Sequence, residues 1–169
     1  MKTNLCKSRR FGFTLVEVMM ATAIMSLVTS SAFALFFFIQ NSYYQASVQE
    51  TATHRASLAI SRMVYGFGVE GRGLRAASDV TRTDTGHGWV LNVKDADGAS
   101  AGSFEYRSDL GTIVYTPADA ATVHPVADSV SQADVEIDSD AMALSIRVGV
   151  ERGRYAASKQ METIVKWRN

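Results

Sequence analysis

Apolar residues dominate the chain from Phe13 to Ile39, and no residue from Val18 to Ile39 carries a charge. At about 1.5 Å per residue, a helix over this run would cross a hydrocarbon core of roughly 30 Å. We therefore predict a membrane-spanning helix over residues 13–39. The side chains expected to face lipid are Leu15, Val16, Val18, Met19, Met20, Ile24, Leu27 and Val28.

Beyond Ile39 the chain becomes polar, yet no proline or glycine interrupts residues 13–65. Apolar residues recur there at three- to four-residue spacing, which is typical of a helix with one buried face. The recurring residues are Tyr44, Val48, Ala52, Ala56, Ile60, Met63 and Phe67. We expect 40–66 to be the amphipathic half of the same long helix. A glycine cluster then stops it, made of Gly66, Gly68, Gly71 and Gly73.

The remainder of the chain alternates apolar and polar residues with a period of two, which indicates strands. The strand segments are 89–93, 104–106, 110–116, 144–150 and 161–167, with turns at Asp97–Gly98 and Gly153–Arg154. Residues 122–140 are acidic and show no sustained pattern, so we expect a loop with a short edge strand at most. The predicted fold is α+β, with the outer half of the helix packed on one antiparallel sheet of four to six strands in a head domain over 67–169.

A basic leader, residues 1–12, precedes the apolar run. It holds four cations and no acid, and those cations are Lys2, Lys7, Arg9 and Arg10. The positive-inside rule keeps such an end on the cytoplasmic side, so the head is expected on the opposite side of the membrane. If the leader is removed, 13 basic residues face 17 acidic ones, which argues against a nucleic-acid partner.

Glu17 is a carboxylate at the start of the apolar helix. An ionised group within hydrocarbon costs about 2.5 to 3.5 kcal/mol on insertion scales, so its position implies a partner charge. The alternative interpretation is a chance polar residue that reaches the membrane interface near a helix end.

An ordinary secretory signal peptide is an alternative for the whole segment, because Ala32, Phe33 and Ala34 form a small-x-small cleavage pattern. Signal-peptide cores span about 7 to 15 apolar residues. The run here continues past that pattern to Ile39, which favours an uncleaved membrane helix at this point.

The segment GFTLVEVMMA, residues 12–21, resembles the signal sequence of type IV prepilins and type II secretion pseudopilins. The resemblance implies that a prepilin peptidase cuts after Gly12 and methylates the new amino terminus at Phe13. It also implies that Glu17 pairs with the Phe13 ammonium of an adjacent subunit and so sets the register of assembly. A pilin-like fold, a helix on an antiparallel sheet, is implied as well.

Within that family the chain resembles a minor pseudopilin of the J or I type. Ala34 stands where many major pilins have a helix-kinking proline, and Cys6, the single cysteine, lies in the leader, so no disulfide closes the head. The implied function is a structural subunit of a short periplasmic filament for protein export. The implied partners are other pseudopilins or pilins, the peptidase, an inner-membrane assembly platform and the lipid bilayer.

Two other functions stay open. One is a major or minor pilin of a true type IV pilus. The other is a signal-anchored periplasmic binding domain or enzyme that keeps its leader and never assembles.

No catalytic constellation stands out. His54, His87 and His124 lack the paired spacing of a zinc site or a general base. Asp95, Asp97 and Gly98 are better explained as a hairpin turn than as a calcium loop. We expect no cofactor, with calcium as the alternative. Its candidate ligands alternate in one segment and are Asp134, Glu136, Asp138 and Asp140.

Overall fold

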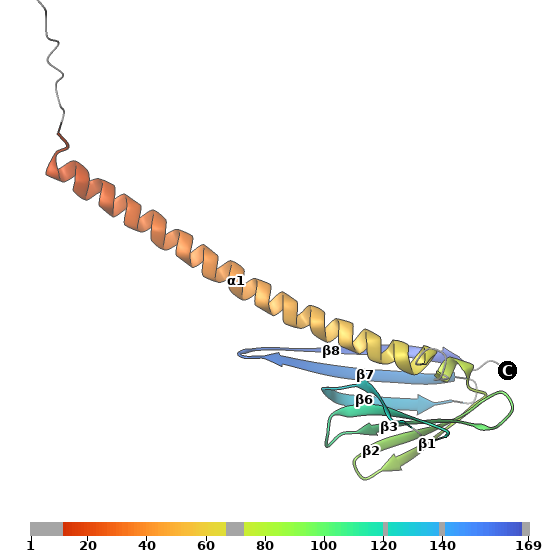
Figure 1. Cartoon of the computed structure of the whole chain (residues 1–169). Coiled ribbons are helices and arrows are strands. Elements are labelled where there is room, and N and C mark those ends of the chain that lie inside the picture. Colours follow the sequence, from red (N-terminus) through yellow and green to blue (C-terminus); the bar gives the residue numbers. More distant parts are fainter. Residues whose placement is uncertain (1–11, 67–72, 120–121, 139–140, 167–169) are drawn as a thin grey trace, which may run out of the picture. The chain divides into compact units, whose positions relative to one another are not determined.

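The computed structural model describes residues 12–66, 73–119, 122–138 and 141–166, and its longest element is helix α1, Leu15–Tyr65 (Figure 1). The helix ends at Tyr65, directly before the glycine cluster. Gly66 adopts a φ of 85°, and its N–H donates to the Arg62 carbonyl at 2.9 Å. A left-handed residue at this position favours glycine and satisfies a carbonyl of the last turn. Phe67, Gly68 and Gly71 lie outside the described residues.

The chain divides into two compact units, Met1–Tyr43 and Tyr44–Asn169. In the first, the described residues after Thr14 are all part of α1. The second contains the outer part of α1 together with every described strand. The outer part of the helix thus belongs with the head, as expected from its amphipathic pattern. The finer boundaries at 12, 39 and 66 stay predictions.

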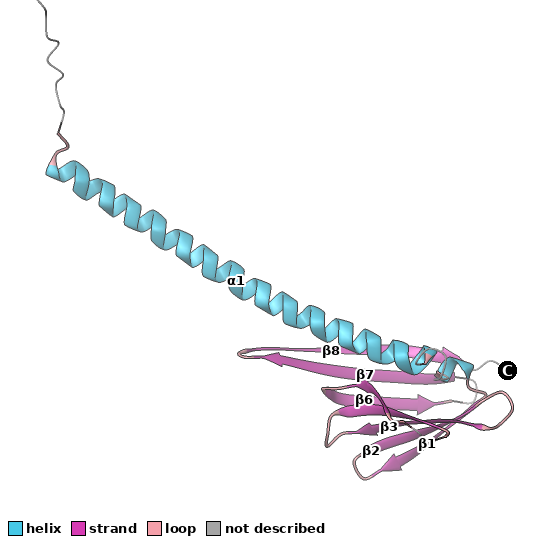
Figure 2. Ribbon diagram, viewed as in Figure 1, coloured by secondary structure: helices cyan, strands magenta, loops and turns pink. Residues whose placement is uncertain are grey.

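The strands form two antiparallel sheets in the described part of the chain, so the prediction of a single sheet was wrong (Figure 2). The first sheet is a five-stranded meander in chain order, preceded by the short 3-10 helix η1, Leu74–Ala76. Its strands are β1 (Asp79–Thr85), β2 (Gly88–Lys94), β3 (Ser100–Arg107), β4 (Thr112–Pro117) and β5 (His124–Ala127). The second sheet contains β6 (Val130–Ile137), β7 (Ala141–Arg152) and β8 (Tyr155–Lys166).

The segment predicted to be mostly loop, residues 122–140, instead holds β5 and most notably the eight-residue β6. A shift of register between Val130 and Gln132 changes which residues face inward. Val130, Ala133 and Val135 are the buried residues of β6, a spacing of three and then two. Because a bulge breaks the period of two, the alternation that reveals a strand is lost there.

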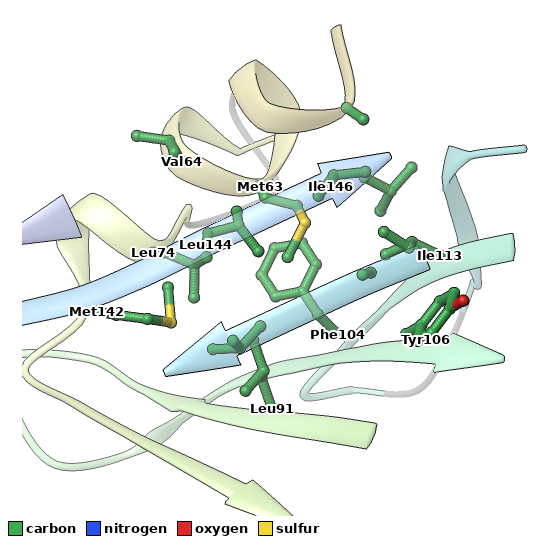
Figure 3. Close-up of a cluster of buried hydrophobic side chains, with 14 of the residues drawn as sticks. Met63, Val64, Leu74, Leu91, Phe104, Tyr106, Ile113, Met142, Leu144 and Ile146 are labelled. Carbon is green, nitrogen blue, oxygen red and sulfur yellow. The ribbon is translucent and has the colours of Figure 1, made fainter. Parts of the chain in front are cut away.

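One hydrophobic core is shared by α1 and both sheets (Figure 3). The buried positions of α1 include Val48, Ala52, Ala56 and Met63, which confirms most of the predicted helix stripe. Ile60 is only partly buried, and Tyr44 is exposed. Most residues of the predicted strand alternations are buried, and these are Trp89, Leu91, Val93, Phe104, Tyr106, Leu144, Ile146, Val148 and Val165. Val150, Met161 and Thr163 are partly buried, and Trp167 lies outside the described residues. The strand expected from Leu110 begins at Thr112.

Side-chain hydrogen bonds connect the two sheets, which share no strand pairing with each other among the described residues. Trp89 Nε1 donates to the Ala133 carbonyl at 2.8 Å, and an Arg82 guanidinium nitrogen donates to the Val135 carbonyl. These bonds supply donors from the first sheet to carbonyls of β6 in the second. Since unpaired buried backbone groups are costly, such bonds hold the two sheets together.

Candidate processing and assembly site

Gly12 and Phe13 lie immediately before the first turn of α1, and both are exposed. Phe13 keeps 81% of its surface accessible. A Cβ added at Gly12 would meet no other atom within 4 Å. The fold of this chain therefore does not itself demand a glycine at position 12, and a requirement for one would come from an enzyme that reads the segment.

Thr14 is the residue that fixes the start of the helix. Its Oγ1 accepts a hydrogen bond from the Glu17 N–H at 3.3 Å, while its carbonyl accepts from the Val18 N–H at 3.2 Å. A threonine with a glutamate three residues later is the pattern of a capping box. The sequence analysis missed this role of Thr14, although the spacing from Thr14 to Glu17 was the signal that would have revealed it.

Glu17 lies in the first turn of α1 and is exposed. A negative charge there is favoured by the N-terminal end of the helix dipole, so the carboxylate helps its own helix as well as any partner. The helix surface beside it is exposed and mostly apolar, and is made of Phe13, Val18, Ala21, Thr22 and Met25. The cleavage, methylation and pairing roles of Gly12, Phe13 and Glu17 stay predictions.

The apolar half of α1 is long and apolar enough to cross a membrane, and the side chains of its most apolar stretch are not buried within the chain. All eight predicted lipid-facing residues are exposed, and these are Leu15, Val16, Val18, Met19, Met20, Ile24, Leu27 and Val28. This surface is what a helix needs to lie in lipid or against other apolar helices, and it fits membrane anchoring.

The hydroxyl groups in this half of the helix are satisfied internally. Each donates to a backbone carbonyl three or four residues earlier, at 2.7 to 3.0 Å. The donors are Thr22, Ser26, Thr29, Ser30 and Ser31. Because hydrocarbon offers no hydrogen-bonding partner, such internal bonds make these polar residues compatible with a bilayer.

The described residues bring together no group of three or more histidine, cysteine, aspartate or glutamate side chains that could hold a metal ion. Asp134 and Glu136 lie on β6, Asp138 lies just beyond it, and Asp140 is outside the described residues. Calcium binding stays a prediction without geometric support from the described candidates.

The two other groups of candidates have structural explanations. Asp95 Oδ1 accepts hydrogen bonds from the N–H groups of Asp97 and Ala99 at 3.1 and 3.0 Å, and Gly98 has a φ of 77°, so this segment is a turn as predicted. His54 lies on α1 and His87 in the turn between β1 and β2. His124 begins β5, where a loop was expected, and stacks on Tyr115 with ring centroids 6.4 Å apart.

Comparison with known proteins gives one match at the start of the chain. Residues 7–33 match the family model described as the prokaryotic N-terminal methylation motif. Searches of curated proteins and of solved structures return no match. The fold is an α+β protein with one long N-terminal helix on antiparallel sheets. Together with the matched motif, that long apolar helix fits a type IV pilin-like protein.

Proposed function

We propose that the chain is a filament subunit, specifically a minor pseudopilin of a type II secretion pseudopilus. The motif over residues 7–33 points to a structural, non-enzymatic family whose members are processed by prepilin peptidase and assemble with other pilins. On this proposal the peptidase cuts after Gly12 and methylates Phe13, and the head lies in the periplasm. The inner-membrane platform then moves the subunit from the bilayer into a short filament.

The observation that carries the proposal is the position of Glu17 in an exposed first turn, directly followed by an uncharged run from Val18 to Ile39. Cleavage after Gly12 would create an ammonium group at Phe13. A neighbouring subunit displaced by about one helical turn, roughly 5.4 Å, would bring its Phe13 ammonium to this carboxylate. The pair would bury two charges that are each costly alone in hydrocarbon.

Two features support a pseudopilin over a pilus subunit. The sequence after the leader contains no cysteine, so no disulfide closes a C-terminal loop. Helix α1 also passes through Ala34 without a proline. Both features agree with the resemblance to a J- or I-type subunit.

Intact-mass spectrometry of the chain isolated from its native host tests the processing step. We expect loss of residues 1–12 and the mass of one methyl group on Phe13. A chain that retains Met1–Gly12 would contradict the proposal and favour an anchored domain that does not assemble. Abundant surface filaments built mainly of this chain would favour a true pilus.

Glu17→Gln tests the assembly step separately. Removing one partner of a buried ion pair costs about 3–5 kcal/mol, so we expect incorporation into filaments to fall at least about tenfold while cleavage after Gly12 continues. Glu50→Gln is the matched control, because Glu50 is exposed on the same helix but lies beyond the apolar half. Normal incorporation of the Glu17→Gln chain would disprove the charge pairing.

A further inference from the structure

The outer surface of the second sheet is hollowed along its middle strand, β7. The side chains that β7 presents there are small, whereas those of β6 and β8 on either side are longer. The flanking side chains therefore leave a trough open above the middle strand. We call this surface the acidic face, and its residues are Asp134, Glu136, Ala143, Ser145, Glu162 and Ile164.

Strand pairing fixes the positions of the carboxylates in the acidic face. One cross-strand row contains Asp134, Ser145 and Glu162, in that order. Because neighbouring strands are about 4.8 Å apart, the backbones that carry the two acids are separated by about 10 Å. A guanidinium group placed above Ser145 would meet a carboxylate on each side. The adjacent row adds a third carboxylate and two apolar side chains.

Those apolar side chains are open to solvent. Ile164 is the most exposed large apolar side chain on any described strand, with 70% of its surface accessible. Ala143, its cross-strand partner on β7, is exposed as well. Apolar surface bordered by charged groups is typical of a protein contact. The surface suits arginine in particular, because the aliphatic part of arginine covers apolar surface while its guanidinium pairs with carboxylates.

The opposite end of the same hairpin is basic. Arg152 and Arg154 lie at the β7–β8 turn with one acid, Glu151, and Lys159 follows on β8. Figure 1 shows this turn extending beyond the ends of the other strands. Nine residues of β7 separate Ala143 from Arg152, which is about 30 Å in a strand. The two ends of one hairpin cannot meet within a chain, but their charges are complementary between two chains.

The tip is ordered before any partner binds. The rings of Tyr44 and Tyr155 lie with centroids 5.8 Å apart and planes at 19°. The Arg154 guanidinium lies 5.1 Å from the centroid of the Tyr155 ring, and its Nη2 donates to the Tyr155 hydroxyl at 2.9 Å. All three residues belong to the compact unit Tyr44–Asn169. A tip held in this way loses little conformational freedom on binding, which favours association.

We propose that the β7–β8 tip of one copy binds the acidic face of a second copy of this chain. An arginine of the tip lies between Asp134 and Glu162, and its aliphatic part covers Ile164. Because the two surfaces differ, the contact is heterologous and continues from copy to copy into a row. The inference goes beyond the proposed function, and it depends neither on cleavage after Gly12 nor on charge pairing by Glu17.

Cross-linking of full chains in mild detergent tests the contact. With Cys6 changed to serine, Ala143→Cys marks the acidic face and Ala156→Cys marks the tip, and both positions are exposed. Asp97→Cys, in the turn after β2, is the reference. A short bis-maleimide is added to mixtures of two single-cysteine chains, one of which carries a longer tag. We expect position 143 to link to 156 at least about tenfold more than to 97. The link should weaken in about 1 M salt, where the Debye length is about 3 Å.

Charge reversal makes the test specific. Arg152→Glu combined with Arg154→Glu should reduce the link between tip and face at least about tenfold, because like charges would then meet. Glu136→Arg combined with Glu162→Arg in the partner chain should restore it. Each variant is checked by circular dichroism, so that a loss of the link is compared only between folded chains.

The matched control makes the same change of charge on the first sheet. Lys94 on β2 and Arg107 on β3 are both exposed. Lys94→Glu combined with Arg107→Glu should leave the link between tip and face unchanged. A loss as large as that caused by reversal at the tip would show that only the total charge matters, and it would overturn the specific contact.

The pattern of links decides between the possible outcomes. Absence of a link between tip and face, or links from tip to tip and from face to face of equal strength, would overturn the contact. A link that reversal at the tip leaves unchanged would also overturn it, because it would indicate association through α1 alone. Processing is measured separately by intact mass. A chain that keeps its leader but links tip to face would therefore refute the proposed function and leave this contact standing.

Discussion

Replacing Ala56 by leucine tests how closely α1 packs on the sheets. Ala52, Ala56 and Ala59 are fully buried and lie on the face of α1 that meets the core. Small side chains there let the helix backbone approach the strands closely. The substitution adds three carbons at a position with no accessible surface.

Two opposing terms set the size of the effect. Burying three more carbons would stabilise the fold by about 2 kcal/mol if room existed for them. In a close-packed core the added volume instead forces side chains off their rotamers and shifts the backbone, which typically costs about 1–3 kcal/mol net. We expect the free energy of unfolding of the head to fall by about 1–3 kcal/mol, or roughly 4 °C in Tm for each kcal/mol.

The assay is urea unfolding of the full chain in mild detergent, followed by tryptophan fluorescence, to which Trp167 and the buried Trp89 both contribute. Ala46→Leu is the control, because Ala46 is exposed on the same helix and the helix propensities of alanine and leucine are close. We expect it to change stability by less than about 0.5 kcal/mol. Equal or greater stability of the Ala56→Leu chain would refute the close packing of α1 on the sheets.

Two further predictions concern the junction of the sheets. Trp89→Phe removes the donor to the buried Ala133 carbonyl and should lower the free energy of unfolding by about 1–3 kcal/mol, measured by chemical denaturation followed by circular dichroism; an unchanged midpoint would show that another donor replaces it. Burial, and secondarily the charge of Asp134, raises the pKa of Tyr106 above 10.0. The folded state therefore holds the phenol proton when the unfolded chain has lost it, and stability should decline as the pH rises above about 10. Tyr106→Phe should flatten that decline, and parallel stability curves for the two chains would contradict the assignment.

The long helix and most strands could be predicted because each depends on a local pattern. The helix required only the absence of breakers over 13–65 and a stripe of small and apolar residues. Strand β1 was missed because Val80 is its one buried residue and the rest of it is exposed, so no alternation appears. The division into two sheets was not predictable in this way, because it depends on long-range bonds such as that from Trp89 to Ala133.

For the candidate site, too, residues close together in sequence could be predicted, whereas contacts between distant residues could not. Gly12, Phe13 and Glu17 lie within six consecutive residues, so a short motif identified them. Tyr155 is more than 100 residues away from Tyr44 in sequence, and neither residue's local pattern predicts that their rings stack. Sequence reasoning identified the turn at Gly153 and Arg154 but not this contact with α1.

The internally bonded hydroxyls of the apolar helix bear on how such a subunit changes surroundings. These hydroxyl groups already donate hydrogen bonds to backbone carbonyls of their own helix. None of them has to change its hydrogen-bond partner when lipid is replaced by neighbouring helices, and the residues concerned are Thr22, Ser26, Thr29, Ser30 and Ser31. On the proposed function, moving this helix from lipid into a filament therefore changes the free energy of these hydroxyl groups little. Glu17 is then the residue whose free energy differs most between the two surroundings. If the chain is such a subunit, the same internal bonds would let it leave or re-enter the bilayer without a new polar contact along those turns.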